Sequence, residues 1–403
     1  MKEPHKIAII LLSTFVSGMG ISSFFIAVNW FIEHIDNSSF YVALVNALCY
    51  LLVLIVLPHI GNLCDYSSRK KILVLIYSCG VVLQLLLCFI VNKASSFELL
   101  VVIICVTTII SVIRTTDQVC RTAYLQSVVS KKYYQLSNQW LEAIRQGITF
   151  IGGGVTALLM KSPSLTTILY FNIITFFIGL LLVLLLPKDT VCIPEKHLKK
   201  LSYIAKLKSG LLVLNGLERW SRIVILFSIV PYALVVALNV TYPIFFKELL
   251  IAHESQFYAA LSIPYGSGAL LASYLNKRVS TNFKRFFMTH CVIFIVALFW
   301  GVLIHNIYAV YCALFTIAYC HAAIRVQRNS FIMSWVNNKD IAKVLSFFEI
   351  IFTLLVIIMS FLLGFICDYF SSTLSWVFTA IVLLVSIILC GIYTTQNQTL
   401  SGV

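Results

Sequence analysis

Long apolar runs alternate with short polar segments along the whole chain. The first run extends from Ile7 to Phe31, and eleven further runs lie near residues 40–60, 72–91, 98–118, 138–160, 166–186, 223–246, 256–275, 285–304, 307–324, 343–367 and 373–392. Since roughly 20 helical residues cross a hydrocarbon layer about 30 Å thick, the pattern predicts twelve transmembrane helices. The runs are continuous rather than alternating, which favours helices over a closed barrel.

Composition supports a membrane protein and argues against several other classes. Of the 403 residues, 60% are hydrophobic and 11% are charged, and the mean hydropathy is +0.98. A soluble globular protein does not have this composition. The twelve cysteines show neither a Cys-x-x-Cys pair nor a Cys/His metal spacing, so we expect no metal, no cofactor and mostly apolar packing roles. No nucleophile or phosphate-loop motif indicates an enzyme.

The basic residues predict how the chain is oriented in the bilayer. With the N-terminus in the cytoplasm, the inner segments carry 24 of the 29 Lys and Arg residues, and the outer loops carry three. The positive-inside rule therefore places both termini in the cytoplasm and explains the net charge of +14 without a nucleic-acid partner. A basic central loop, 187–222, separates a first half, 1–186, from a second half, 223–403.

The chain also matches itself at an offset of 207 residues. At this offset, Arg121–Val129 meets Arg328–Val336, and the single-residue matches are Gly61 with Gly268, Leu63 with Leu270, Lys70 with Lys277, Arg114 with His321 and Glu142 with Glu349. One offset that serves several regions predicts two parallel six-helix repeats. Asp65 and Arg69 fall on Ala272 and Asn276, so the second repeat lacks this charge pair.

A short polar loop between the second and third runs carries the most specific motif. Residues 61–71 have the pattern Gly-x-Leu-x-Asp-x-x-x-Arg-Lys-Lys, which includes Gly61, Asp65 and Arg69. This pattern resembles the loop 2-3 signature of the major facilitator superfamily, with Tyr66 and Ser68 at two positions that depart from it. The resemblance implies an all-α membrane protein of twelve helices in two six-helix halves, and a monomer that works by alternating access.

The resemblance also implies partners for the charges of this loop. In the superfamily, the Asp of the signature lies against the start of the eleventh helix, here near Ile341 to Val344. Its Arg reaches an acid at the inner end of the fourth helix, here Asp117. We therefore expect Asp65 and Arg69 to form a gating latch.

Ionisable residues within the predicted spans are the candidates for transport chemistry. Such groups are costly in a bilayer, and they usually face a cavity or a partner. We expect a polar cavity whose carboxylates bind a coupling proton and whose cations hold an anionic substrate, formed by Arg114, Glu142, Arg145, His321 and Glu349. Structural alternatives remain: an intrahelical pair for Glu142 with Arg145, and a hydrogen-bonded packing role for His321. Asp117, Arg121, Arg325 and Arg328 can also be solvated membrane anchors, the role that we favour for the three arginines.

Finer resemblances suggest a direction of transport. The run Gly152–Gly154 is placed like the Gly-Pro signature of proton-coupled exporters, although Gly153 replaces the Pro. Ala27–Trp30 and Asn138 resemble the branch with macrolide-efflux and enterobactin-exporter proteins. The resemblance implies proton-coupled export of a small amphipathic or anionic molecule, such as a siderophore or drug, across a bacterial inner membrane. Import, lipid transport and a non-transporting sensor or assembly partner remain alternatives, because a fold does not fix a substrate.

The predicted topology can be tested by cysteine labelling in a variant without native cysteines. Cysteine placed at Ser38 or Ser371, in predicted outer loops, should react with an impermeant maleimide in intact cells. Cysteine at Ser202, in the central loop, should react only after the membrane is permeabilised. Labelling of position 202 from outside would overturn the orientation.

Overall fold

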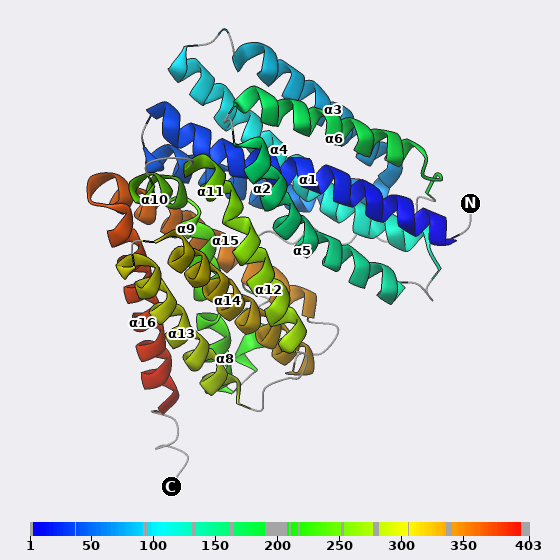
Figure 1. Ribbon diagram of the computed structural model, residues 1–403. Coiled ribbons are helices and arrows are strands. Elements are labelled where there is room, and N and C mark those ends of the chain that lie inside the picture. Colours follow the sequence, from blue (N-terminus) through cyan, green and yellow to red (C-terminus); the bar gives the residue numbers. More distant parts are fainter. Residues whose placement is uncertain are drawn as a thin grey trace. The chain divides into compact units, whose positions relative to one another are not determined.

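The computed structural model describes residues 3–36, 38–91, 93, 95–130, 134–161, 164–189, 208, 211–216, 218–250, 254–276, 282–304, 306–335 and 341–395. In this part of the chain, every regular element is a helix (Figure 1). The chain divides into two compact units. The first comprises Met1–His197 with Leu250–Ile263, and the second comprises Leu198–Leu249 with Pro264–Val403.

The described part of the first unit contains six long helices and one short one. They are α1 (Glu3–Asp36), α2 (Ser39–Tyr66), α3 (Arg69–Val91), α4 (Ser96–Val128), α5 (Tyr134–Leu159), α6 (Leu165–Leu184) and α11 (Glu254–Ala260). Helix α1 packs mainly against α6 and α5, and α11 packs against α5. Small residues permit close contact: a Cβ added at Gly80 would come within 2.4 Å of the Phe176 ring.

The second unit contains short and long helices. They are α8 (Arg219–Phe227), α9 (Val230–Leu238), α10 (Tyr242–Leu249), α12 (Ser262–Leu275), α13 (Phe283–Leu303), α14 (Ile307–Trp335), α15 (Ile341–Tyr369) and α16 (Ser372–Thr395). The closest pairs are α13 with α14 and α15 with α9. Gly268 on α12 lies so near α14 that an added Cβ would meet the Phe315 carbonyl oxygen at 2.2 Å.

Ten helices in the described part are long and apolar enough to cross a membrane. Two of the twelve predicted spans are absent from this set. In the predicted 138–160 span, the apolar part of α5 is only Gly147–Leu159, which is too short to be counted. The predicted 256–275 span is divided into α11 and α12 at Leu261. A further prediction, 223–246, covers α8, α9 and α10, and the stretch Trp220–Leu238, which comprises most of α8 and all of α9, is counted as one of the ten. The breaks coincide with Pro231 and Pro243, because proline lacks an N–H group and fits best in a first helical turn.

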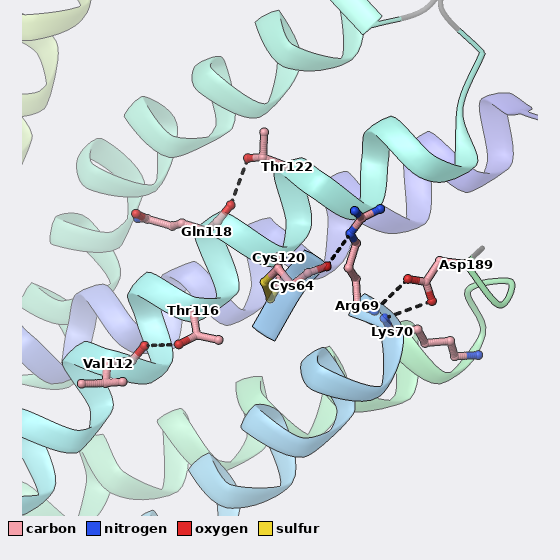
Figure 2. The surroundings of a disulfide bond; sticks show 9 residues. All are labelled: Cys64, Arg69, Lys70, Val112, Thr116, Gln118, Cys120, Thr122 and Asp189. Atoms are coloured by element: carbon pink, nitrogen blue, oxygen red, sulfur yellow. Dashed lines mark hydrogen bonds between the residues drawn. A yellow bond between two sulfur atoms is a disulfide. The ribbon is translucent and has the colours of Figure 1, made fainter. Parts of the chain in front are cut away.

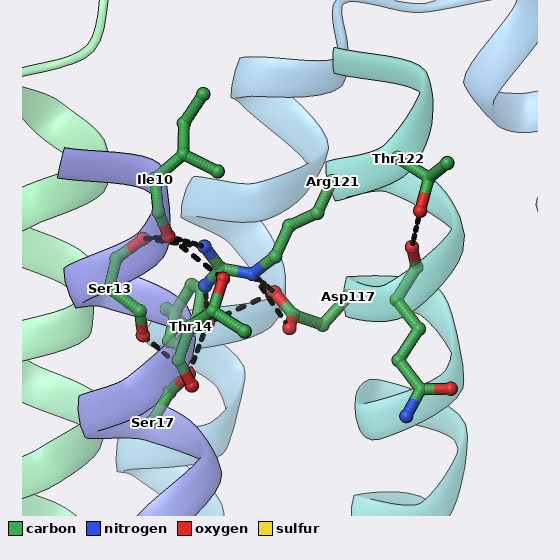
Figure 3. Close-up of polar contacts among 9 residues, drawn as sticks. Ile10, Ser13, Thr14, Ser17, Asp117, Arg121 and Thr122 are labelled. Atoms are coloured by element: carbon green, nitrogen blue, oxygen red, sulfur yellow. Dashed lines mark hydrogen bonds and ion pairs between the residues drawn. The ribbon is translucent and has the colours of Figure 1, made fainter. Parts of the chain in front are cut away.

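A buried polar network joins α1, α3 and α4 of the first unit (Figure 3). The side chain of Arg121 is 2% exposed. Its Nε donates to both carboxylate oxygens of Asp117, at 2.7 and 2.8 Å, and the guanidinium also donates to Ser13 Oγ, to the Ile10 carbonyl and to the Tyr77 hydroxyl. The anchor alternative for Arg121 is therefore wrong. Asp117, one turn earlier on the same helix, neutralises the guanidinium inside the protein.

Removing the Asp117 carboxylate should destabilise the folded protein, because the Arg121 guanidinium would stay buried without its ion-pair partner. Breaking a buried ion pair by removing one partner costs about 3–5 kcal/mol, because the other charge stays buried without compensation. We expect Asp117→Asn to lower the thermal unfolding midpoint of the purified protein strongly. The double variant Asp117→Asn with Arg121→Gln should recover most of the loss. If the single variant unfolds at the wild-type temperature, the pair does not stabilise the first unit.

Candidate functional site

The signature loop is a tight turn between α2 and α3, and it is closed by a residue distant in sequence (Figure 2). Asp189, which follows α6, accepts hydrogen bonds from Ser68 Oγ at 2.6 Å, from the Arg69 N–H at 2.7 Å and from the Lys70 N–H at 3.4 Å. Lys70 Nζ donates to the carbonyls of Leu184 and Leu186. Asp189 thus satisfies the free N–H groups at the start of α3, as a capping residue does.

The cap also affects the ionisation of Asp189. Partial burial raises the pKa of this carboxyl, but the hydrogen bonds from Ser68 and from the backbone N–H groups outweigh burial and lower the pKa below its usual value. A lowered carboxyl pKa in the folded state means stability that is present above the unfolded-state pKa. That contribution is lost as the pH falls through the folded-state pKa.

The predicted pairing of Arg69 with Asp117 is wrong in this structure. Arg69 Nε donates to the carbonyl of Cys64 at 3.1 Å, in the last turn of α2 (Figure 2), while Asp117 is held by Arg121 and Tyr77. A cation near the C-terminal carbonyls of a helix is favourable, which explains the position of Arg69. Gly61 and Asp65 lie in the last turns of α2, but the side chain of Asp65 lies outside the described residues. Its contact with the start of α15 stays a prediction.

A disulfide joins the end of α2 to α4 beside this turn (Figure 2). Cys64 and Cys120 are its partners, and their Cα atoms lie 5.9 Å apart. The sequence predicts mostly packing roles for the cysteines and indicates no disulfide pair. Sequence spacing cannot reveal such a pair, because the two cysteines come from different helices that only the fold brings together.

Of the other candidates of the first unit, Arg114 and Arg145 have described side chains. Arg114 on α4 is exposed, and its Cζ lies 5.6 Å from the centre of the Phe25 ring. Arg145 on α5 is half-buried. The Glu142 side chain lies outside the described residues, so its pairing with Arg145 stays a prediction.

A polar cavity of about 350 Å³ lies within the second unit. Helices α9, α14 and α15 contribute its lining residues: Tyr232, Arg325, Arg328, Asn329, Leu345, Phe348, Glu349 and Phe352. Two arginines and one glutamate therefore meet among aromatic rings. Of the predicted candidates, Glu349 lies here.

The charges of this cavity lack direct ionic partners among the described residues. Arg325 places its Cζ 5.0 Å from the centre of the Tyr232 ring, and Arg328 places its Cζ 5.6 Å from that of Phe348. Arg328 is 8% exposed, and its one hydrogen bond to a described side chain is a long one, 3.4 Å, to Asn329. Neither Arg328 nor Glu349 makes a contact ion pair in the described part. The anchor alternative for Arg328 is therefore wrong, because this guanidinium is buried rather than solvated.

His321 lies in a stack of rings next to the cavity. The ring of Tyr232 stacks on that of Phe352, with 4.5 Å between ring centres, and on that of His321, with 5.5 Å between ring centres. The ring of Tyr265 also stacks against His321, again with 5.5 Å between ring centres. The histidine is 2% exposed, and neither ring nitrogen has a hydrogen-bond partner among the described residues. The alternative of a hydrogen-bonded packing histidine is therefore wrong. In the described part, the rings of Tyr232 and Tyr265 pack against it instead.

The offset of 207 residues relates contacts in one unit to contacts in the other. Phe25 contacts Arg114 in the first unit, and their counterparts Tyr232 and His321 stack in the second. Arg121 corresponds to Arg328. The acid that holds Arg121, Asp117, corresponds to Ile324, so Arg328 lacks that carboxylate.

Sequence reasoning missed most of the cavity wall. Tyr232, Phe348 and Phe352 are aromatic residues inside apolar runs, where they carry no special signal. The self-match was the one signal that could have found Tyr232, as the counterpart of Phe25. Asp189 was missed because a cap supplied from another helix leaves no local pattern.

Comparisons with solved structures show the same fold at low sequence identity. The nucleoside transporter NupG (D323A mutant) matches with a TM-score of 0.74 and 14% identity, over 96% of this chain and 99% of that one. A bacterial homologue of the iron transporter ferroportin, in an inward-facing state, matches with a TM-score of 0.73 and 13% identity, over 98% and 99%. The human organic anion transporter MFSD10 (TETRAN) matches with a TM-score of 0.61 and 11% identity, over 97% and 100%.

Sequence comparison identifies the family. No curated protein matches the chain. The family model described as Major Facilitator Superfamily matches residues 10–317 and 225–401, which together span nearly the whole chain. The described residues form no regular element other than helices, ten of these helices are long and apolar enough to cross a membrane, and the structural neighbours are transporters; this chain is a multi-pass membrane transporter that belongs to the major facilitator superfamily.

Proposed function

We propose that this transporter couples proton movement to the transport of a small amphipathic or anionic molecule by alternating access. The observation that carries the proposal is the cavity of the second unit, where Glu349 shares a space with Arg325 and Arg328 and makes no contact ion pair with a described residue. A carboxyl can carry a proton, and a guanidinium can hold an anion. Both kinds of group line this one cavity.

The contrast between the two acids supports Glu349 as the coupling residue. Asp117 accepts both of its short hydrogen bonds from Arg121 Nε and a further contact from Tyr77, so protonating it would break a closed network. Among the described residues, no hydrogen bond to Glu349 would be lost when it is protonated. A group that must gain and lose a proton in each cycle is better placed in the surroundings of Glu349 than in the closed network of Asp117.

Export, a bacterial inner membrane and a siderophore or drug substrate remain predictions from sequence resemblance. In the structure, Gly153 sits where an added Cβ would come within 2.4 Å of the Ser262 Cβ. Ser262 belongs to the first unit, as Gly153 does, and it leaves no room there for a larger side chain, independently of the direction of transport. The solved relatives are named for nucleosides, iron and organic anions, so the fold does not select a substrate. An anionic substrate suits the two arginines.

The coupling role of Glu349 can be tested in proteoliposomes that contain a pH-sensitive dye. When a panel of small amphipathic and anionic compounds is added against a preset pH gradient, the wild-type protein should move protons in response to a substrate. Glu349→Gln should abolish this response, because the amide cannot bind and release the proton. Glu98→Gln is the control, since Glu98 is an exposed acid at the start of α4 and Gln can replace Glu in its capping box.

Three outcomes are informative. Loss of proton movement in Glu349→Gln alone supports the proposal. Normal, pH-dependent movement in that variant would remove Glu349 from the coupling mechanism. No substrate-dependent movement in the wild type, with any compound, would favour the non-transporting sensor.

A further inference from the structure

We propose that the substrate is a compact organic anion with a flat ring, and that it binds this cavity together with the proton on Glu349 rather than in exchange for it. The inference rests on the proposed function, and it adds the chemical class of the substrate and the sign of the coupling. It is carried by two arginines without carboxylate partners in the described part, three aromatic walls and one acid.

The two guanidinium groups define the charge of the ligand. Arg325 and Arg328 lie one turn apart on α14, and both line the cavity. Two guanidinium groups face one carboxylate, so the cavity has a net charge of +1 when Glu349 is ionised and +2 when it is protonated. Guanidinium groups bind carboxylates with two parallel hydrogen bonds, and their donors here are not used by an acid of the described chain. A ligand carboxylate fills that role.

The walls define the rest of the ligand. Tyr232, Phe348 and Phe352 come from two helices and line the same space as the arginines. Aromatic rings stack favourably with one another, which gives a flat ring an advantage over an aliphatic group of equal size. The volume of about 350 Å³ lies at the lower end of the range for ligand pockets, so the cavity suits a compact molecule.

The sign of the coupling follows from the charges around Glu349. Arg325 and Arg328 on α14 are the charged side chains that line the cavity with it, and α9 contributes only Tyr232. Helix α16, which also packs on α15, has no charged residue, and on α15 Asp368 lies five turns away while Lys343 lies outside the described side chains. A bound anion and an ionised Glu349 repel one another and compete for the same cations. Protonation of Glu349 removes both effects, so the proton and the anion favour each other's binding.

Mutual stabilisation of the two ligands has a consequence for direction. Binding couplings are reciprocal, so a proton that strengthens anion binding is itself held more tightly when the anion is bound. The two then cross the membrane in the same direction. Where the proton gradient points inward, this co-transport drives uptake, the alternative that the sequence left open.

The test is a binding measurement on the purified full-length protein, with benzoate as the probe. Affinity is measured by titration calorimetry at mildly acidic and mildly alkaline pH, where benzoate stays ionised. We expect wild-type binding to be roughly tenfold tighter at acidic pH, within the about 5- to 150-fold range of typical couplings between sites. Cyclohexanecarboxylate, which has the charge without the flat ring, and benzyl alcohol, which has the ring without the charge, should bind more weakly than benzoate.

Substitutions of cavity residues test whether benzoate binds in this cavity. Arg325→Gln and Tyr232→Leu should each weaken benzoate binding, whereas Arg222→Gln, an arginine of α8 that hydrogen-bonds to Asn215, should not. Glu349→Gln should bind benzoate tightly at both pH values, because its side chain is always neutral. Arg325→Lys, checked for a normal unfolding temperature, covers the case in which the Gln variant does not fold.

The outcomes separate this inference from the proposed function. Tighter binding at acidic pH that disappears in Glu349→Gln supports the inference, even if the proteoliposomes move no protons. Binding that is equal at both pH values, tighter at alkaline pH, or unchanged in both Arg325 variants overturns it. Proton movement driven only by cationic or neutral compounds, with no benzoate binding, also overturns it but leaves proton-coupled transport intact.

Discussion

The cost of keeping a guanidinium group out of water shapes both units of this protein. A buried cation is tolerated when a carboxylate and further hydrogen bonds replace its hydration. In the first unit, Arg121 has Asp117, Ser13 and Tyr77, and the group closes into a network that joins three helices. In the second unit, the counterpart Arg328 is almost as buried but has Ile324 where the acid would be. The two corresponding arginines therefore differ: Arg121 belongs to a closed network, whereas Arg328 lacks the equivalent carboxylate.

The signature turn shows the same principle at a helix end. Helix α3 begins with N–H groups that have no partner within the helix, and Asp189 supplies the acceptors from beyond α6. Arg69, which the resemblance marks as a gating residue, donates to a backbone carbonyl of α2, and its neighbour Lys70 donates to a backbone carbonyl of α6. The turn between α2 and α3 is thus fixed from within the first unit. Any contact of this turn with other parts of the transporter would therefore not be needed to hold the conformation of the turn.

The features that sequence predicts well are those with a strong local pattern. Apolar runs place most of the helices, because a span must satisfy its backbone internally whatever its neighbours are. The breaks at Pro231 and Pro243 were missed because continuous hydrophobicity hides a helix interruption. The Arg69–Asp117 pair was wrong because a nearer cation, Arg121, competes for the acid. The aromatic wall of the cavity could not be predicted, since a phenylalanine that lines a cavity and one that packs in a core look alike in sequence.

A cavity with two cations and one acid must still allow the second unit to fold, and the rings explain how. Tyr232 and Phe348 each lie near a guanidinium, and such contacts contribute about 0.5–1 kcal/mol, or about 2 where water is excluded. This is less than a buried carboxylate supplies, since losing one costs about 3–5 kcal/mol. The rings therefore stabilise the two guanidinium groups in part, but they do not replace the hydrogen bonds that a carboxylate would accept. An anion that enters finds donors that are already oriented and only partly compensated, which is the condition under which binding releases free energy that a transport cycle can use.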